Sequence, residues 1–512
     1  MWAEFGCRNL GDYHDLYVTT DVALLADVFE NFRNVCQEKY GLDPAHYYSA
    51  PGLSWEALLK KTEVELDLLT DMDMHLMIER GMRGGISMVS KRYAKANNPL
   101  VEGYDPSQPT NYVTYLDANN LYGWAMSLPL PKKNFHWKRV MPTEEQIMKM
   151  KRNSKKGWIL EVDLEYPSHL HDFHNDYPLA PEKKAIKQER MSEYQRRLMA
   201  EHDLTPPNTD KLLLTLEDKE KYVVHHGNLQ FYLSQGMRLK KVHRVIEFDQ
   251  EPWMESYIRM NTEFRKQARN DFETDFYKLM NNSVIGKTME NLRNRVDVKI
   301  VRAWEADKLR NLTSSPAYDR FAIFGNDMAG IHMRKTKLVL NKPVYTGMTI
   351  LENSKILMYD FFYNKLKARY GENCGLVYTD TDSLILDIQT EDVYEDMKQE
   401  SWMYDTSNYP KGHPLYSVTN KKVLGKMKDE CGGDVIEEVV AVRLKMYSVL
   451  SKKKPQKSER SEKECYRERD NSRALQRSSL WKEAVQAQNE ILKERGARNV
   501  RNVHEQDLNI AV

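Results

Sequence analysis

The feature that most constrains this chain is the polar run YTDTDS at residues 378–383, which lies between two apolar runs. Residues 375–388 therefore predict two strands around a polar turn. Side chains two apart on an extended chain point to one side, so Asp380 and Asp382 are expected to converge at a hairpin tip. Two like charges held together favour a divalent cation with oxygen ligands. By itself the run is also typical of a plain turn, since Asp, Thr and Ser favour turns.

A third carboxylate, Asp117, follows the β-branched and aromatic run 112–116, which predicts a short strand, and precedes a helix-like segment. A lone Asp in this place is most often a helix N-cap. Here Leu121, Tyr122 and Trp124 put apolar and aromatic side chains beside it. Three carboxylates from two strand ends could bind two metal ions, a pair suited to phosphoryl transfer.

A polar stretch with helical periodicity covers residues 255–291. It places Lys278 and Asn282 four residues apart on one face. Lys278 could meet a triphosphate as a point charge, Asn282 could hydrogen-bond a sugar or base, and Gly286 leaves room for a flat ring. The alternative is a solvated helical face that ends at a glycine.

The remaining periodicity predicts a mixed fold. Helices are expected over residues 12–40, with Asp21 on or beside the apolar face, and over residues 53–80. Further strands are expected over 158–164 and 436–450. Because strands and helices mix without regular βαβ alternation, the fold class is predicted to be α+β.

Charge is uneven along the 512 residues. The whole chain carries 76 Lys and Arg against 75 Asp and Glu, but residues 451–512 hold 15 basic and 10 acidic side chains. The body is therefore mildly acidic and the tail basic. An acidic body can bind nucleic acid where carboxylates hold metal and basic groups line a groove. In the tail, one amphipathic helix is predicted from Leu480, Ala484, Ala487 and Ile491.

The five cysteines are odd in number, and none is at CxxC spacing. This disfavours zinc and a disulfide framework and favours a reducing, intracellular location, with nucleus and cytoplasm both open. The chain has no run of about 20 apolar residues and no signal-peptide pattern at its N-terminus, so no membrane partner is expected.

Four motifs together resemble those of the family B DNA polymerases. DANNLYG (117–123) is similar to the DxxSLYP segment, KLMNNSVIG (278–286) to KxxxNSxYG, YTDTDS to YxDTDS, and RLKMY (443–447) contains the KxY element. They stand in the family's order, and the resemblance covers roughly residues 10–450. It is closer to the protein-primed branch, which serves viruses, linear plasmids and self-synthesising DNA transposons.

The resemblance implies roles for these residues. Two Mg²⁺ ions, with Mn²⁺ as an alternative, would be held by Asp117, Asp382 and the Ala118 carbonyl, with Asp380 as a supporting catalytic carboxylate. Nucleotide contacts would come from Tyr122 as a sugar gate and from Lys278, Asn282 and Gly286. Primer and DNA contacts would come from Lys445, Tyr447, Tyr378, Thr379, Arg83, Gly84 and Gly85.

Departures from the family pattern also matter. Ile285 replaces an aromatic residue that stacks on the nucleotide, and Met82 replaces the Tyr of a YxGG element that guides the template. Tyr17 and Asp21 resemble the last motif, YxxxD, of the family's 3′–5′ exonuclease. The earlier exonuclease carboxylates would lie upstream of this chain, so an N-terminal truncation without proofreading is expected.

The resulting expectation is a right-hand polymerase palm and fingers behind the remnant of an RNase H-like exonuclease domain. Five units are expected. They are an exonuclease remnant and connector (1–85), palm with an insertion (86–254), fingers with a second insertion (255–345), palm with the YTDTDS hairpin and KMY element (346–450), and an irregular basic tail (451–512). The tail is either a source of non-specific DNA affinity or a foreign, partly disordered extension.

The predicted function is template-directed DNA synthesis by two-metal nucleotidyl transfer, encoded by a mobile or viral element. Its partners would be template-primer DNA, deoxynucleoside triphosphates and a terminal protein as primer. A catalytically impaired, DNA-binding remnant is the alternative. A two-metal nuclease is disfavoured because Lys278, Asn282 and Tyr122 would have no role. A reverse transcriptase is disfavoured because Thr381 separates the paired aspartates.

Overall fold

The fold is built around a mixed β-sheet that holds the predicted strands. The computed structural model describes residues 2, 4–186, 189, 191–205, 209–335, 337–451 and 456–457. The sheet has ten strands in this part of the chain, seven of them in the order β1-β13-β14-β3-β17-β18-β19. Their bounds are β1 Ser87–Val89, β13 Cys374–Asp380, β14 Ser383–Gln389, β3 Asn111–Ala118, β17 Ile436–Arg443, β18 Met446–Ser451 and β19 Gln456–Lys457.

Three short strands complete this central sheet. Strands β15 and β16 pair in parallel, β16 pairs with β3, and β2 pairs with β17. The strand predictions at 112–116 and 375–388 are confirmed, and the run at 436–450 forms two strands, β17 and β18. The remaining strands are β2 Tyr93–Lys95, β15 Tyr404–Asp405 and β16 Met427–Asp429.

Helix α12 (Val344–Tyr359) is buried along nearly its whole length. It continues into a π-helical segment, Asp360–Lys367. It contacts the helices α4 (Leu121–Met126) and α8 (His226–Ser234) and the strands β4 (Leu130–Trp137) and β8 (Lys219–His225). Its buried side chains include Glu352 and Lys355, whose charged groups are 3.7 Å apart. The helix thus forms the centre of the core. Shorter helical segments are α13 Ala368–Tyr370, α14 Val393–Gln399, η1 Pro44–His46, η2 Ser168–Leu170, η6 Gly371–Asn373 and η7 Ser401–Met403.

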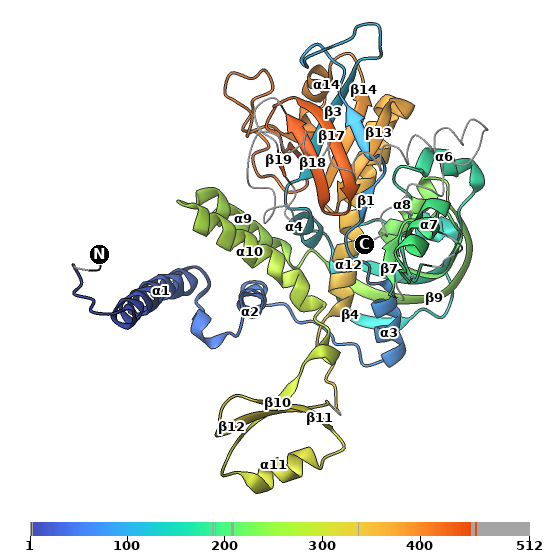
Figure 1. Cartoon of the computed structure of the whole chain (residues 1–512). Helices are drawn as coiled ribbons and strands as arrows, with labels where there is room; N and C mark the ends of the chain where they lie inside the picture. The colour runs from blue at the N-terminus through green and yellow to red at the C-terminus, as the bar shows by residue number, and fades with distance from the viewer. Residues whose placement is uncertain are drawn as a thin grey trace.

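A second sheet has the order β4-β9-β5-β8 and lies beside the first (Figure 1). The strand predicted at 158–164 is confirmed as part of β5. The elements of this region are β4 Leu130–Trp137, α5 Glu144–Lys149, β5 Lys156–Glu165, α6 His171–His174, β6 Glu182–Lys184, α7 Glu193–Glu201, β7 Lys211–Leu213, β8 Lys219–His225, α8 His226–Ser234 and β9 Arg238–Glu251.

The helical stretch predicted over 255–291 is two helices, α9 (Glu255–Gln267) and α10 (Asp271–Thr288). The break falls at Ala268, whose backbone is extended, and at Asn270, whose side chain accepts a hydrogen bond from the Glu273 amide and caps α10. A small sheet, β10-β12-β11, follows and projects from the body (Figure 1). Its elements are η4 Leu292–Asn294, β10 Asp297–Arg302, α11 Ala306–Thr313, β11 Tyr318–Ile323 and β12 Met328–Met333.

The single helix predicted over 53–80 is wrong. The chain forms α2 (Ala50–Thr62) and α3 (Met72–Gly81) with a non-helical segment between them. Glu63 ends α2 in the left-handed region (φ 51°), and the Asp71 side chain caps α3 by accepting hydrogen bonds from the Asp73 and Met74 amides. Local capping therefore overrides the longer periodicity.

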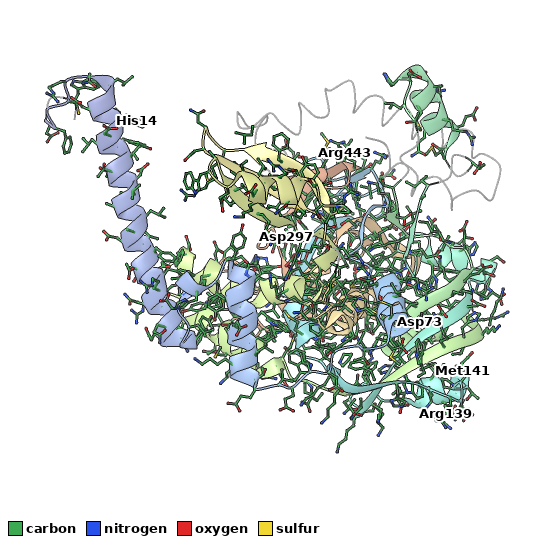
Figure 2. All side chains as sticks on the ribbon, turned by 90° about the horizontal axis from the view of Figure 1, so that it is seen from below. His14, Asp73, Arg139, Met141, Asp297 and Arg443 are labelled. Atoms are coloured by element: carbon green, nitrogen blue, oxygen red, sulfur yellow. The ribbon has the colours of Figure 1, made fainter. Side chains whose placement is uncertain are left out.

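Helix α1 (Leu10–Tyr40) confirms the helix predicted over 12–40, but its apolar face is packed only near the end. Cys36 and Tyr40 are buried, whereas Leu24 and Leu25 are 59% and 67% exposed. The Tyr40 hydroxyl donates to Asn261 of α9 at 2.7 Å, and the Asn261 amide donates to Asn281 of α10 at 3.0 Å. The rest of α1 stands clear of the body in Figures 1 and 2.

Two other expectations concern cysteines and membranes. Cys7, Cys36, Cys374 and Cys431 are free thiols. Among the helices of the described segments, none combines the length and apolarity that a membrane crossing requires. Cys465 and the amphipathic helix predicted near Leu480 lie outside the described residues, and the domain boundaries stay predictions.

Candidate active site

The YTDTDS hairpin brings its two aspartates to the end of strand β3. Ser383 of β14 pairs in register with Asp117 of β3, and the Ala118 amide donates to the Asp382 carbonyl at 2.7 Å. Thr381 turns the chain in the left-handed region, with φ 65°. The predicted convergence therefore arises from strand pairing, which fixes Asp117 directly beside the hairpin tip.

The hairpin tip rests on the segment that contains Gly85. The Thr381 amide donates to the Ile86 carbonyl at 2.6 Å. A Cβ atom at Gly85 would lie only 2.3 Å from the Thr381 hydroxyl oxygen, so glycine is required for this close approach. At Gly84 a Cβ would meet open space.

Asp380 is held by hydrogen bonds and an ion pair. The Ser87 hydroxyl donates to one carboxylate oxygen at 2.5 Å, and the Lys445 ammonium lies 2.5 Å from the other. The Tyr378 hydroxyl also donates to Asp380, at 3.4 Å. Asp380 is thus occupied by protein donors, which suits a supporting rather than a central carboxylate.

Asp117 and Asp382 carry the strongest electrostatic signal of the site. Burial raises the pKa of Asp117 to about 8, and the charge of Asp382 adds to that rise. Burial also raises the pKa of Asp382, and the carboxylate of Asp380 adds to it. Lys278 opposes both rises, which places its cation near the pair. Within the described ranges, no group of three or more His, Cys, Asp or Glu side chains is placed to hold a metal ion.

A lysine and a glutamate that sequence reasoning missed also lie at Asp117. Strand β16 pairs antiparallel with β3 and sets Lys428 opposite Asp117. The Lys428 ammonium is 2.7 Å from the Glu430 carboxylate. Lys428 lowers the pKa of Asp117, and Glu430 raises it. The run KMKDE has no strand-like alternation of its own, so only the pairing with β3 reveals it.

Tyr122 lies close enough to Asp382 and Asp380 for their charges to act on its phenol. It is on the short helix α4 (Leu121–Met126), which Asn120 caps by accepting a hydrogen bond from the Gly123 amide at 3.1 Å. Burial raises the pKa of the Tyr122 phenol to about 12, with smaller contributions from Asp382 and Asp380. The ring is therefore half-buried beside the carboxylates.

Helix α10 presents the predicted nucleotide-binding residues. Lys278 is exposed, and the Asn282 side-chain oxygen is buried without a hydrogen-bond partner in the part of the chain that the structure describes. A Cβ at Gly286 would meet open space. Ile285 is 8% exposed and packs in an apolar cluster with residues of α2 and α9, so it cannot stack on a ligand as placed.

Lys445 and Tyr447 lie on the same hairpin, against the YTDTDS strand. The Tyr447 and Tyr378 ring centroids are 4.7 Å apart, and the Tyr447 hydroxyl is 2.8 Å from that of Tyr115 on β3. The Lys445 amide donates to the Tyr378 hydroxyl at 3.1 Å. The KMY element is therefore fixed beside Asp380.

Three predicted DNA contacts are corrected by their burial. Tyr378 and Thr379 are fully buried, and the Thr379 hydroxyl donates to the Ser383 carbonyl at 2.9 Å. Arg83 is 5% exposed, donates to the Val223 carbonyl at 2.7 Å and stacks 3.8 Å from the Tyr222 ring. These side chains hold the fold together and present no surface to DNA.

The residues that resemble an exonuclease motif are not brought to this site. Tyr17 is 57% exposed and Asp21 is exposed, both on the part of α1 that stands clear of the central sheet (Figure 1). The structure thus joins Asp117, Asp380, Asp382, Tyr122, Lys278 and the KMY element, and leaves Tyr17 and Asp21 apart.

Comparison with known protein families shows which family the chain belongs to. A family model described as DNA polymerase type B, organellar and viral, matches residues 14–365, more than two thirds of the chain. The chain belongs to this family. The resemblance read from the four motifs is thereby confirmed.

Solved structures of phi29 DNA polymerase are also similar to this chain. An orthorhombic crystal form is 14% identical, with a TM-score of 0.46, and the match covers 82% of this chain and 59% of that one. The complex with primer-template DNA and incoming nucleotide substrates is 15% identical, with a TM-score of 0.45, over 83% and 59%. This type B polymerase chain thus spans less than two thirds of the phi29 enzyme. No curated protein matches it.

Proposed function

We propose that this type B polymerase chain is a template-directed DNA polymerase that extends a primer 3′-hydroxyl with deoxynucleotides. The observation that carries the proposal is the meeting of Asp117, Asp382, Tyr122 and Lys278 from three separate segments at one sheet end. Two half-buried carboxylates and a cation suit the binding of a metal–triphosphate.

The donor set fits divalent metal. Asp117 and Asp382 are half-buried carboxylates that repel each other, and a cation would relieve that cost. Asp117, Asp382 and the Ala118 carbonyl would hold Mg²⁺ or Mn²⁺. When bound, a metal pair activates the attacking oxygen and neutralises charge on the leaving phosphate.

The chain's own residues position the reactants. Lys278 attracts the triphosphate, and the half-buried ring of Tyr122 limits the space at the sugar. The Asn282 side-chain oxygen, which has no partner among the described residues, is free to accept a hydrogen bond from the base or sugar. The open space at Gly286 leaves room for them. Lys445, fixed by Asp380, steadies the primer terminus. Holding reactants in this geometry accounts for much of the rate in such transfers.

Primer extension tests the proposal. The full chain with a primed template, Mg²⁺ and four deoxynucleotides is expected to lengthen the primer, and Asp382→Asn to abolish extension while DNA binding persists. Asp387→Asn, at the far end of the same strand β14, is the matched control. Equal activity of wild type and Asp382→Asn would show that the metal assignment is wrong.

Two alternatives have distinct outcomes. Binding of DNA without extension by the wild type would support a catalytically impaired remnant, an interpretation that the buried Ile285 favours. Primer shortening without nucleotides would support a nuclease; none is expected, because Asp21 lies apart on α1.

Protein priming and a mobile or viral origin are further proposals, consistent with the organellar and viral family. A reducing, intracellular location, in the nucleus or the cytoplasm, is proposed from the odd number and wide spacing of the cysteines alone.

A further inference from the structure

Asp405 is a buried carboxylate that lies two strands away from Asp117. It ends the short strand β15 and is 1% exposed. Asp405 pairs in register with Lys428 of β16, and Lys428 pairs in register with Asp117 of β3. Burial of a carboxylate is unfavourable unless hydrogen bonds compensate it, so the partners of Asp405 indicate what it does.

Three N–H groups compensate the buried carboxylate, and one of them comes from the segment that follows Asp117. The Asn119 side-chain amide donates to Asp405 Oδ2 at 2.7 Å, and the Lys422 backbone amide donates to the same oxygen at 2.8 Å. The Ser407 backbone amide donates to Oδ1 at 3.1 Å. Asp405 therefore joins the segment after β3 to the loop between β15 and β16.

The backbone of Asn119 is held by the same loop. Its amide donates to the Lys426 carbonyl at 2.9 Å, and its carbonyl accepts a hydrogen bond from the Gly425 amide at 2.8 Å. Asn119 is thus fixed through its backbone and through its side chain, and the side-chain bond is the one that depends on Asp405.

The next residue, Asn120, has a conformation that needs this support. It lies in the left-handed region, with φ 44° and ψ 62°, which is unfavourable for a residue other than glycine. Its side chain caps α4 by accepting a hydrogen bond from the Gly123 amide at 3.1 Å. Asn119 and Asn120 therefore form the turn that sets the position of Tyr122, on α4, relative to Asp117, on β3.

We propose that Asp405 is a positioning residue for nucleotide addition and acts through Asn119. The turn that it fixes presents Asp117, the Ala118 carbonyl and Tyr122 to the reactants. This inference rests on the proposed polymerase function. A shift of the turn would change two properties together, which are the affinity of the site for divalent metal and the exclusion of a 2′-hydroxyl by the Tyr122 ring.

Asn119→Leu tests the contact with little disturbance. It removes the donor to Asp405 at a similar side-chain size, while two backbone amides still satisfy the carboxylate. Thr406→Val is the matched control, because it removes the hydrogen bond from the Thr406 hydroxyl to the Leu415 carbonyl in the same loop and leaves Asn119 in place. Urea unfolding checks that both variants are folded. Asn119→Ala, which adds no bulk, replaces Asn119→Leu if that chain does not fold.

Two properties of primer extension separate positioning from a merely structural role. In Asn119→Leu, the ratio of kcat/KM for deoxynucleotides to that for ribonucleotides should fall at least fivefold. The Mg²⁺ concentration for half-maximal extension should rise at least fivefold. Thr406→Val should change neither quantity by more than twofold. If either quantity of Asn119→Leu stays within twofold of the wild type, the proposal is overturned.

Binding of Mn²⁺ tests the positioning role without catalysis. Electron paramagnetic resonance measures free Mn²⁺ during titration of each chain, and Asp382→Asn serves as the blank for other sites. The affinity should fall at least fivefold in Asn119→Leu and stay unchanged in Thr406→Val. A wild type that extends no primer would contradict the polymerase function. The Mn²⁺ titration would still decide the role of Asp405, because equal affinities of wild type and Asn119→Leu would overturn it.

Discussion

Lys428 lies directly across from Asp117, in register on neighbouring antiparallel strands, and pairs with Glu430 at 2.7 Å. Residues opposite each other on paired strands share one face of the sheet. The half-buried Asp117 therefore has a cation on strand β16 as well as Lys278 on helix α10.

Replacing Lys428 with Met is expected to weaken nucleotide binding. The change removes a positive charge near Asp117 and releases the negative charge of Glu430, so the site repels a triphosphate more strongly. We expect KM for the deoxynucleotide to rise about fivefold, equivalent to about 1 kcal/mol, with a smaller change in kcat. Steady-state extension measures both. Lys426→Met, whose ammonium lies over the Trp402 ring, is the control; an unchanged KM for Lys428→Met would contradict the prediction.

Gly85→Ala is expected to displace the hairpin tip. The added methyl would meet Thr381 at 2.3 Å, and overpacking of this kind costs about 1–3 kcal/mol. Urea unfolding should show the loss of stability, and extension should fall at least tenfold. Gly84→Ala adds its methyl to open space and should leave the stability unchanged. Similar stability of the two variants would show that the contact relaxes without cost.

Gly286→Ala tests whether a ligand approaches helix α10. The methyl meets no protein atom and alanine favours a helix, so stability should rise by about 0.5–1 kcal/mol. If the nucleotide lies against this surface, KM should rise at least threefold. A wild-type KM would move the nucleotide site away from Gly286.

Stability should fall with pH below 6.5 because of buried histidines. Burial lowers the pKa of His174 and of His226 to about 4, and lowers that of His225 well below its usual value. Between pH 6.5 and about 4 the unfolded chain binds protons that the folded chain does not, so folding loses about 1.4 kcal/mol per group per pH unit. Urea midpoints at pH 7.0 and 5.5 measure this. His174→Phe should show a shallower slope; an identical slope would contradict this assignment.

Strong local patterns predicted the elements that carry the carboxylates. Each of these elements has apolar residues at the spacing of one kind of secondary structure and ends at polar residues. They are the strand before Asp117, the YTDTDS hairpin and the helix with Lys278. Their meeting point followed from the family's motif order rather than from the periods themselves. The structure adds the physical reason, which is the pairing of Ser383 with Asp117.

Other features depend on tertiary contacts that no single segment reveals. Helix α12 is central, yet its Glu352 and Lys355 look like surface residues; burial is possible because the Lys355 ammonium donates to the Arg83 carbonyl at 2.9 Å. The burial of Arg83 itself depends on Val223, 140 positions away. The exposure of Leu25 could not be predicted either. An apolar helix face predicts that some partner covers it, but the sequence of the helix does not identify that partner.

Hydrogen bonds from Tyr40 through Asn261 to Asn281 connect helix α1 to helix α10. The 31 residues of α1 make an arm about 46 Å long. The arm is anchored at Tyr40, and the last residue of the relay, Asn281, directly precedes Asn282 in the helix that bears Lys278. A displacement of α1 would therefore be transmitted through this buried pair of asparagines to the helix that bears Lys278.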